Sequence, residues 1–132
     1  MLLTKKSEYA LLSLALIAKT KVAMSAEDLS VHLNISKSFL AKILQNLARH
    51  DILKSHKGVN GGFILIISPQ DMTIFNIVVV AEEKIPAVFE CSTNNNICNA
   101  SLNGECTLFP ALNNLQYKIN DFLKNLTLQD IM

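Results

Sequence analysis

The chain has 132 residues, of which half are hydrophobic and 17% are charged. This predicts one compact domain, or one small domain with an appendage, and excludes an intrinsically disordered chain. The net charge of +1, taken alone, argues against a nucleic-acid binder, and three cysteines cannot all pair within one chain. The sequence shows no secretory signal and no apolar run long enough to span a membrane. We therefore expect a cytoplasmic protein with reduced thiols and no membrane partner.

The charge is unevenly distributed along the chain. Residues 1–68 carry nine lysines and arginines and four acidic residues, a net of +5. Residues 69–132 carry three lysines and seven acidic residues, a net of −4. A basic part joined to an acidic part predicts that one part faces a polyanion. A merely solvated basic face is the alternative explanation.

Two helices are predicted at the start of the chain. Residues Lys5–Thr20 are apolar on most sides, as in a buried helix. Ser25 and Asp28 have the spacing of an approximate capping box, which predicts a short helix from Ala26 to about Leu33. Asn34 follows, and asparagine tolerates the left-handed conformation in which many helices end.

The next helix completes a helix-turn-helix pair and is predicted from Lys37 to about His50, with Ser36 as its N-cap. Its apolar side chains recur at helical spacing: Leu40, Ile43, Leu44 and Leu47. Polar and cationic side chains occupy the remaining surface, as a helix that reads the DNA major groove requires. We expect DNA contacts from Ser36, Lys37, Ser38, Lys42, Gln45 and Asn46.

A β-hairpin is predicted next. Two strand-like runs, Ile52–Lys57 and Phe63–Ile67, flank a loop with three glycines and an asparagine. A helix-turn-helix followed directly by a glycine-tipped hairpin is a winged helix, in which the hairpin approaches the minor groove or the DNA backbone. From this wing we expect contacts by His56, Lys57, Asn60 and Gly61. The alternative is a helical domain whose hairpin only covers the core.

The second half predicts a helix over Thr73–Glu83, an irregular stretch over Pro86–Gly104 and a long C-terminal helix through about Leu126. The last helix carries apolar residues at alternating spacings of four and three: Leu108, Leu112, Leu115, Ile119, Phe122 and Leu126. We expect this seam to pair with a second copy in a homodimer, so that two recognition helices meet two half-sites. Packing of the seam on its own domain is the alternative.

These elements divide the chain into three parts. Residues 1–68 form the winged-helix DNA-binding domain. Residues 69–107 hold a linking helix and a cysteine segment, and residues 108–132 hold the dimerisation helix and a last turn capped by Thr127. The expected fold class is mainly α with a small β-hairpin wing.

Three cysteines, Cys91, Cys98 and Cys106, lie within 16 positions, in or beside the irregular stretch. Thiolates are soft ligands that suit iron–sulfur clusters, zinc or copper(I). The lack of a CxxC pair argues against a zinc finger or ribbon. Three thiolates leave one coordination position to another residue, and an oxygen or nitrogen ligand there would make the centre labile, as suits a sensor. Three unrelated cysteines are the alternative.

The sequence resembles the Rrf-two family of bacterial winged-helix regulators. The resemblance covers almost the whole chain, and it is carried by Tyr9–Leu11, Ile35–Leu40, Leu53–Phe63, the three-cysteine segment and Thr127–Ile131. The family includes an iron–sulfur cluster biogenesis regulator, a nitric-oxide-sensitive repressor and a cysteine-metabolism repressor. The resemblance implies a homodimer with crossed C-terminal helices and an iron–sulfur cluster held by the three cysteines, whose state sets repression or activation.

The resemblance also bears on the fourth ligand. The cluster biogenesis regulators have a histidine three residues after the third cysteine, where this chain has Phe109. The nitric-oxide-sensitive repressors use an acidic residue from the first helix of the partner, usually aspartate. Glu8 stands at the matching position and is the expected fourth ligand, supplied by the second copy. The alternative is an ordinary first-turn acid favoured by the helix dipole.

Together these features predict a transcription regulator, a repressor rather than an activator, that binds operator DNA and is not an enzyme. We expect it to sense nitric oxide, redox state or iron–sulfur status through a 4Fe–4S rather than a 2Fe–2S cluster, which air would remove. One alternative keeps the fold but senses cysteine oxidation or binds zinc without a cluster. Another, of a different class, is a protein–protein interaction module without specific DNA binding.

Overall fold

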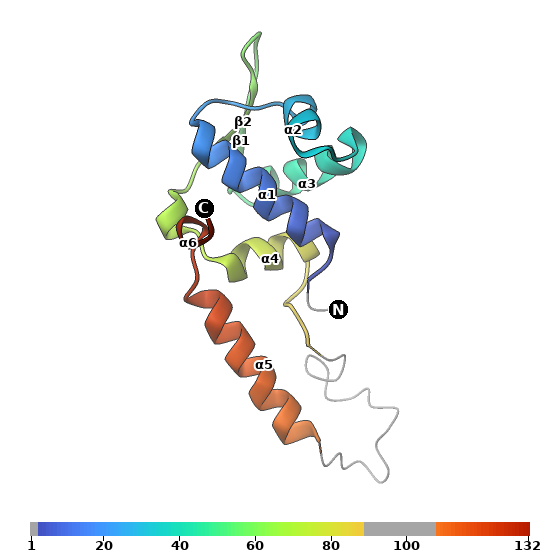
Figure 1. Ribbon diagram of the computed structural model, residues 1–132, viewed down its shortest axis with the longest axis vertical. Helices are drawn as coiled ribbons and strands as arrows, with labels where there is room; N and C mark the ends of the chain where they lie inside the picture. Colours follow the sequence, from blue (N-terminus) through green and yellow to red (C-terminus); the bar gives the residue numbers. More distant parts are fainter. Residues whose placement is uncertain (1–2, 89–107) are drawn as a thin grey trace.

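The fold is mainly helical with one β-hairpin, as predicted (Figure 1). The computed structural model describes residues 3–88 and 108–132. In chain order the elements are α1 (Lys5–Thr20), α2 (Ala26–Leu33), α3 (Lys37–Arg49), β1 (Leu53–His56), β2 (Gly62–Leu65), η1 (Pro69–Asp71), α4 (Ile74–Glu82), α5 (Phe109–Lys124) and α6 (Leu128–Ile131). Within these ranges, no helix is long and apolar enough to cross a bilayer.

Local side-chain chemistry sets most of the helix ends. The capping box of α2 is confirmed: Ser25 Oγ accepts from the Asp28 N–H at 3.0 Å, and Asp28 Oδ2 accepts from the Ser25 N–H at 3.1 Å. Asn34 ends α2 in the left-handed conformation, with φ of 54°. Ser36 precedes α3 as predicted, but its side chain does not cap the helix and instead lies 3.1 Å from Ser38 Oγ.

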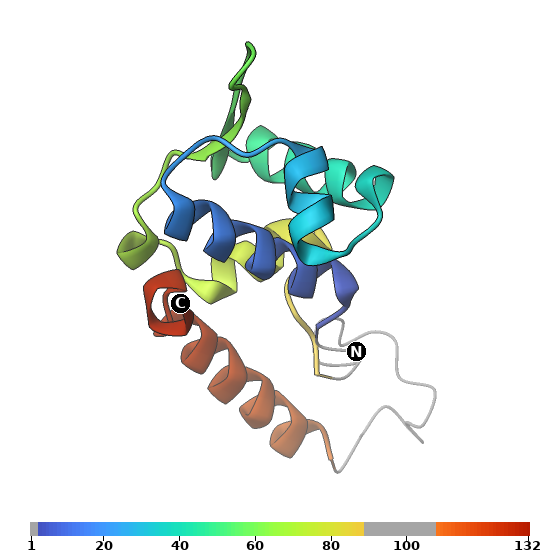
Figure 2. The same ribbon diagram turned by 45° about the horizontal axis from the view of Figure 1, so that its top comes forward.

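Helix α1 lies at the centre of the core. Its buried face contacts α3 and α4, and its C-terminal part contacts β2 and α6 (Figure 2). Fully buried side chains from five helices meet there: Leu14, Leu29, Leu40, Leu44, Leu47, Ile77, Val78 and Leu128. Since burial of one such side chain stabilises a fold by about 1.5–3 kcal/mol, this cluster supplies most of the driving force for folding.

The hairpin extends beyond the helices (Figure 1). Strands β1 and β2 are antiparallel, and Leu53 is paired with Leu65 at the base and His56 with Gly62 near the turn. The hairpin is fixed to the segment before α2, because Phe63 and Met24 exchange two backbone hydrogen bonds of 2.8 and 3.2 Å. This short three-segment arrangement holds β2 against the domain while its turn reaches away from it.

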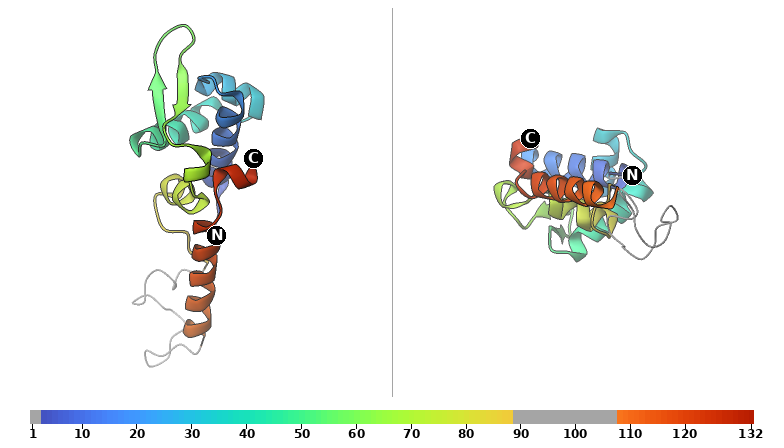
Figure 3. Two further views of the ribbon diagram at one scale, coloured as in Figure 1. Left: turned by 90° about the vertical axis from the view of Figure 1, so that its left-hand side faces the viewer. Right: turned by 90° about the horizontal axis from the view of Figure 1, so that it is seen from below.

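Helix α5 extends away from the domain, and its C-terminal part lies beside α4 (Figures 1 and 3). The chain after it returns to the core, where the Ile74 N–H donates to Leu126 O at 2.8 Å and the Leu128 N–H donates to Met72 O at 2.9 Å. Residues Phe109–Lys124 are helical, so the helix is shorter than predicted. The position of α5 against the domain buries some residues of the predicted seam and leaves others exposed.

The predicted seam therefore divides. Ile119 and Leu126 are half-buried and pack against the core of their own domain, as does Leu123, which the pattern did not single out. Leu108, Leu115 and Phe122 remain 63%, 41% and 65% exposed. The alternative of packing on the own domain is thus correct for Ile119 and Leu126. Leu108, Leu115 and Phe122, on the adjacent stripe of the helix, are left without a described contact.

Gly62 of the wing leaves no room for a side chain. Its φ is +149°, and a Cβ there would collide with the backbone of Met24 and lie 2.6 Å from Ser25 N. We expect Gly62→Ala to destabilise the protein by about 1–3 kcal/mol, since both strain and overlap oppose it. Urea unfolding measures the change. Val59→Ala, at the fully exposed tip, is the control and should leave stability unchanged; equal stability of both variants would contradict the packing described.

Candidate nucleic-acid interface and effector segment

The exposed face of α3 carries the residues expected to contact DNA. Ser36, Lys37 and Ser38 are exposed at its N-terminal end. Lys37 Nζ lies 3.8 Å from Glu27 Oε2, but both side chains are more than 60% exposed, so this pair holds the lysine only weakly. One to two turns further along, Lys42 and Gln45 are exposed too. The amino-terminal two-thirds of α3 therefore presents hydroxyl, amide and ammonium groups to solvent.

A shallow hollow of about 720 Å³ joins this face to the hairpin. Lys42, Gln45 and Arg49 of α3 line one side, and Ser55 and Phe63 of the hairpin line another. Lys6 of α1 also lines it. The structure thus brings together groups from α1, α3 and the hairpin that the sequence places up to 57 residues apart. Three cations line the hollow, and Glu83 is the one acidic residue among the lining residues that the structure describes.

Arg49 and Lys6 are two cations that the sequence analysis did not include among the DNA contacts. The spacing of Lys42, Gln45 and Arg49, by three and four residues, places them on one helix face and could have identified Arg49. Lys6 belongs to a helix that the sequence predicts to be buried, and nothing in its spacing indicates that it joins the same hollow. Only the packing of α1 beside α3 reveals it.

The wing presents its predicted contact residues at the surface. His56, Lys57 and Asn60 are exposed. Gly61 is half-buried and closes the turn through its N–H, which donates to Gly58 O at 2.9 Å. A Cβ at Gly61 would collide with His56 O and lie 2.8 Å from Gly58 O. Glycine at this position is therefore required by the turn itself, whatever the turn contacts.

Asn46 is buried at the inner edge of the DNA face, and its expected role as a DNA contact is corrected. The side chain is 7% exposed, and its Nδ2 donates to Val80 O of α4 at 2.7 Å. Val80 is in the last turn of α4, where carbonyls lack partners within the helix. Asn46 therefore supplies, from within the core, the hydrogen-bond donor that the Val80 carbonyl at the end of α4 lacks. The helical spacing predicted an exposed side chain, because Asn46 lies within about 60° of Lys42 and Arg49 around the helix axis. The packing of α4 beside this position is what buries it.

The end of α4 is held a second time, by Glu82. Its Oε1 accepts hydrogen bonds from Thr4 N at 2.9 Å and from Ser7 Oγ at 2.7 Å, as well as from the Thr4 hydroxyl. Partial burial would raise the pKa of Glu82, but these hydrogen bonds outweigh it and hold the pKa below its ordinary value. The carboxylate form thus ties α4 to the N-terminus of α1.

Glu8, the expected fourth ligand, lies one turn into α1 and is exposed. Its Oε2 is 2.9 Å from Lys5 Nζ, and this hydrogen bond with its charge raises the pKa of Lys5. An exposed pair of this kind is weak, so the carboxylate stays accessible to another group. The three cysteines lie outside the described residues. Within residues 3–88 and 108–132, no group of three histidine, cysteine or acidic side chains could hold a metal ion.

Gln116 fixes the start of the segment that contains the cysteines. This side chain of α5 is 5% exposed. Its Oε1 accepts from the Val88 N–H at 2.8 Å, and its Nε2 donates to Pro86 O at 2.6 Å. The chain before residue 89 is therefore held against the middle of α5, about two turns from Leu108, where the described chain resumes. Periodicity did not single out this glutamine, since a polar residue on a helix usually faces solvent.

A helix-turn-helix followed by a hairpin, with exposed cations on the second helix and on the wing, defines a winged-helix DNA-binding protein. The chain belongs to the Rrf2 family of transcriptional regulators. The model of that family, described as an iron-dependent transcriptional regulator, matches residues 3–132. The predicted fold class and family are thereby both confirmed.

Individual relatives agree with this assignment. A helix-turn-helix transcriptional regulator of Neisseria meningitidis serogroup A is 32% identical, over the whole of this chain and 88% of its own length. The regulator NsrR of Halalkalibacterium halodurans is 30% identical, over the whole of this chain and 90% of its own. The structure of CymR, the global cysteine regulator of B. subtilis, matches 99% of this chain and 95% of its own with a TM-score of 0.77 at 21% identity, which shows the shared fold.

The neighbouring residues Gln45 and Asn46 provide a matched pair of substitutions. Asn46→Ala leaves the buried Val80 carbonyl without its partner, so we expect a loss of about 1–3 kcal/mol in the free energy of unfolding. Gln45→Ala should change stability by less than about 0.5 kcal/mol but weaken operator binding by about 1–3 kcal/mol. Urea unfolding and DNA titration separate the two effects. A stable Asn46→Ala protein with lost base specificity would contradict the burial described.

The hydrogen bonds to Glu82 predict a pH dependence of stability. Because the pKa of Glu82 in the folded protein lies below its unfolded value of about 4.5, its contribution is complete above that pH and is lost as the pH falls through the folded pKa. Glu82→Gln should therefore be less stable than the parent at pH 6, and the difference should narrow between pH 5 and pH 3. Urea unfolding across this range measures it. The exposed neighbour Glu83, replaced by glutamine, is the control; a Glu82→Gln difference that stays constant with pH would refute the assignment.

Proposed function

We propose that this chain is a homodimeric repressor whose binding to operator DNA is controlled by an iron–sulfur cluster that senses nitric oxide or redox state. The observation that carries the DNA-binding part is the accessible basic face shared by α3 and the wing, in a chain that belongs to a family of transcriptional regulators. The regulatory part is supported by the iron-dependent description of that family and by the three closely spaced cysteines.

In the proposed complex α3 enters the major groove and the wing follows the adjacent backbone or minor groove. Gln45 reads a base edge, because an amide can donate and accept at once. Cations around it neutralise phosphates: Lys37, Lys42, Arg49, Lys57 and Lys6. The hydroxyls of Ser36 and Ser38 bind phosphate at the start of α3, and His56, Asn60 and Gly61 contact DNA from the wing. Asn46 is left out of this set because its amide is engaged with Val80.

The proposed dimer contact is the stripe formed by Leu108, Leu115 and Phe122. Successive members are seven residues apart, so they lie on nearly the same side of α5. Their exposure leaves a large apolar surface in water along a helix that extends away from the domain. Such surfaces commonly mark interfaces. Pairing of two such stripes would also place two copies of α3 on one DNA duplex.

The residues available for the cluster fit it in chemistry and in chain length. Cys91, Cys98 and Cys106 would bind it as thiolates, and Glu8 of the second copy would complete the ligand set. Val88 is held by Gln116 of α5, and the chain resumes at Leu108, just before the start of the same helix. Gln116 and Leu108 are about 12 Å apart along the helix axis. Its length is ample to bring three side chains to one centre across that span. When bound, the cluster would supply iron atoms that react with nitric oxide.

Glu8 would connect this sensor to the DNA-binding domain. It belongs to α1, whose N-terminal turn is held to the end of α4 through Glu82, and α4 is held to α3 through Asn46. Binding or release of the cluster by the Glu8 carboxylate would therefore act on α1, which is already joined to α3 through α4. Loss of such a link between the cluster segment and the DNA-binding domain would change how the two parts are positioned.

The dimer proposal predicts the effect of a single polar substitution. Phe122→Ser should convert the dimer to a monomer in analytical ultracentrifugation, and operator affinity should fall at least tenfold because the two half-sites would be bound separately. Tyr117 is 72% exposed on another side of α5, so Tyr117→Ser is the matched control and should stay dimeric. A Phe122→Ser protein that remains dimeric with normal operator affinity would exclude this stripe as the interface.

The sensor proposal is tested by purification without oxygen, followed by visible spectroscopy and counting of iron, sulfide and zinc. We expect a coloured protein with about four iron atoms per chain, which Cys98→Ser abolishes. Glu8→Ala should alter the spectrum or shorten the lifetime of the cluster. The matched control is Glu27→Ala, because Glu27 is also an exposed glutamate in the first turn of a helix and lies beside a lysine. This variant should leave the spectrum and the lifetime of the cluster unchanged.

Other results would redirect the proposal. An iron-free protein that resists reconstitution would exclude the cluster, and one zinc per chain would favour regulation by zinc or cysteine oxidation. An unchanged cluster in Glu8→Ala would remove Glu8 from the ligand set. Failure to select any operator from random DNA would leave the fold as a protein-interaction module.

A further inference from the structure

The side-chain amide of Asn46 is held from two sides. Its Nδ2 donates to Val80 O at 2.7 Å, and its Oδ1 accepts from Arg49 Nη2 at 3.2 Å. The reversed amide would turn Oδ1 toward the Val80 carbonyl and the NH₂ group toward the guanidinium, so both contacts would be repulsive. The two partners therefore fix one orientation of a buried amide, and this amide ends on a cation of the DNA face.

Arg49 is the one arginine of the chain. Its neighbours in the hollow include Lys6, Lys42 and Glu83. Within residues 3–88 and 108–132 it forms no ion pair, and its side-chain hydrogen bond goes to Asn46. A guanidinium has five N–H donors in one plane and can bind a phosphate through two of them, whereas an ammonium acts as a point charge. Since Asn46 engages one donor, the others are available to a ligand.

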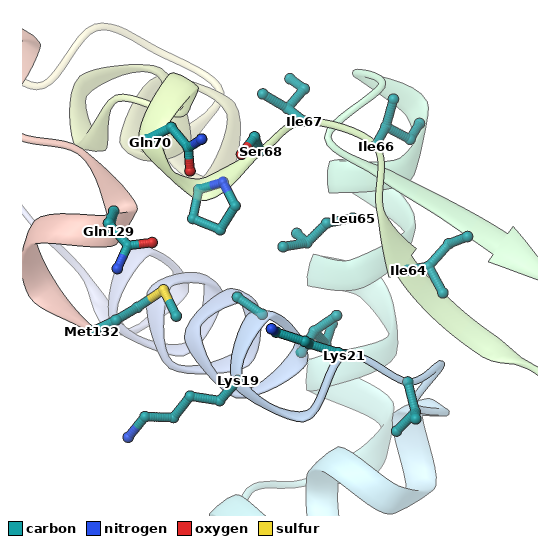
Figure 4. A pocket seen from close by; sticks show the side chains of 14 residues that line it. Lys19, Lys21, Ile64, Leu65, Ile66, Ile67, Ser68, Gln70, Gln129 and Met132 are labelled. Carbon is teal, nitrogen blue, oxygen red and sulfur yellow. The ribbon is translucent and has the colours of Figure 1, made fainter.

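The lysines nearby have no comparable partner. In the part of the chain that the structure describes, the side chains of Lys6 and Lys42 form no hydrogen bond or ion pair. The same is true of Lys19 and Lys21, which line a groove of about 1000 Å³ between α1, β2 and α6 (Figure 4). Positive charge alone therefore does not distinguish a position on this domain. What distinguishes Arg49 is its buried partner.

The Val80 carbonyl connects this contact to α4. It belongs to the last turn of the helix, where carbonyls lack partners within the helix. The same turn is held to α1, because Glu82 accepts from Ser7 Oγ at 2.7 Å. The orientation of the Asn46 amide, and with it that of Arg49, thus depends on where α4 ends. A side chain that is held before binding loses less conformational entropy in a complex, which increases affinity.

We propose that Asn46 is a positioning residue for DNA binding, which presents the Arg49 guanidinium to one backbone phosphate in an orientation set by the last turn of α4. The inference rests on the proposed function for its ligand, operator DNA. Because phosphates carry no base identity, Asn46 contributes to affinity and not to base selection. A displacement of α4 from α3 would break the hydrogen bond with Val80, and Arg49 would then bind phosphate less tightly.

The first measurement uses the full chain without DNA or cluster. Isotope-labelled arginine gives a single side-chain Nε signal, because Arg49 is the one arginine, and NMR relaxation of that signal reports its mobility. We expect Arg49 of the parent to be clearly less mobile than free arginine, and Asn46→Ala to bring it close to free arginine. Asn125→Ala, the same substitution at an exposed asparagine, is the control and should leave the signal unchanged.

The second measurement is a double-mutant cycle on an operator selected from random DNA. Asn46→Ala should weaken binding about threefold in the parent but not in Arg49→Gln, because residues of one hydrogen-bond network are coupled. In Lys42→Gln, which removes a cation of the same hollow that Asn46 does not contact, the loss should persist. Arg49→Gln should also lower the slope of log affinity against log salt by about one unit. Each titration is made at a temperature at which circular dichroism shows the variant to be folded.

Three results would overturn the proposal. An Arg49 of the parent that is as mobile as free arginine would do so without any variant. Equal losses from Asn46→Ala in the parent and in Arg49→Gln would show that Asn46 acts only through stability. A loss on the operator that is absent on random duplex DNA would indicate base selection instead of a phosphate contact.

A failure of the proposed function gives a different result. A parent protein that binds no DNA would remove the phosphate role of Arg49 together with the regulator. The mobility of Arg49 in the parent and in Asn46→Ala would still show whether the amide holds the guanidinium.

Discussion

The structure depends on the burial of α1. This helix contacts α2, α3, α4, α6 and strand β2, so each part of the domain is positioned against it. Small side chains at Ser7, Ala10 and Ser13 are completely buried and allow the neighbouring helices to approach closely. The two hydroxyls remain satisfied, because Ser13 Oγ donates to Tyr9 O at 2.7 Å and Ser7 Oγ donates to Glu82. A larger residue at any of the three would displace α4.

The last turn of α4 is held both by α3 and by the start of α1. It receives Asn46 from the recognition helix and accepts from Thr4 and Ser7 at the start of α1, and the chain that leaves it leads toward the cysteines. These contacts are short, directional and partly or fully buried, so α4 cannot shift without breaking at least one of them.

The sequence alone was sufficient for features that depend on local chemistry. The capping box at Ser25, the cap at Thr127, the left-handed Asn34 and the glycine-tipped hairpin each arise from residues within a few positions of one another. Features that depend on tertiary packing were not predictable in this way. Asn46 satisfies the patterns of a surface position, and only the proximity of Val80, 34 residues away, shows that it is internal.

The same limit applies to the long helix and to the basic face. A repeat of four and three residues identifies one stripe on α5, but it does not specify how the helix is rotated against its own domain. Ile119 therefore packs inward although Phe122 faces solvent. Likewise Lys6 joins Lys42 and Arg49 only because α1 lies beside α3. The cysteine ligands and the partner contact of Glu8 remain predictions from the sequence.

The hydrogen bond from the Val88 N–H to Gln116 has a thermodynamic consequence. It closes a ring of chain, 28 residues along the sequence, that contains all three cysteines. Bringing the ends of a free segment of that length together costs conformational entropy that grows with the logarithm of its length. Here the folded domain meets that cost before anything binds, because the hydrogen bond joins residues of the described chain on either side of the segment. A ligand that needs the two ends of this segment to be close would therefore bind more tightly because of Gln116, even without contact to that side chain.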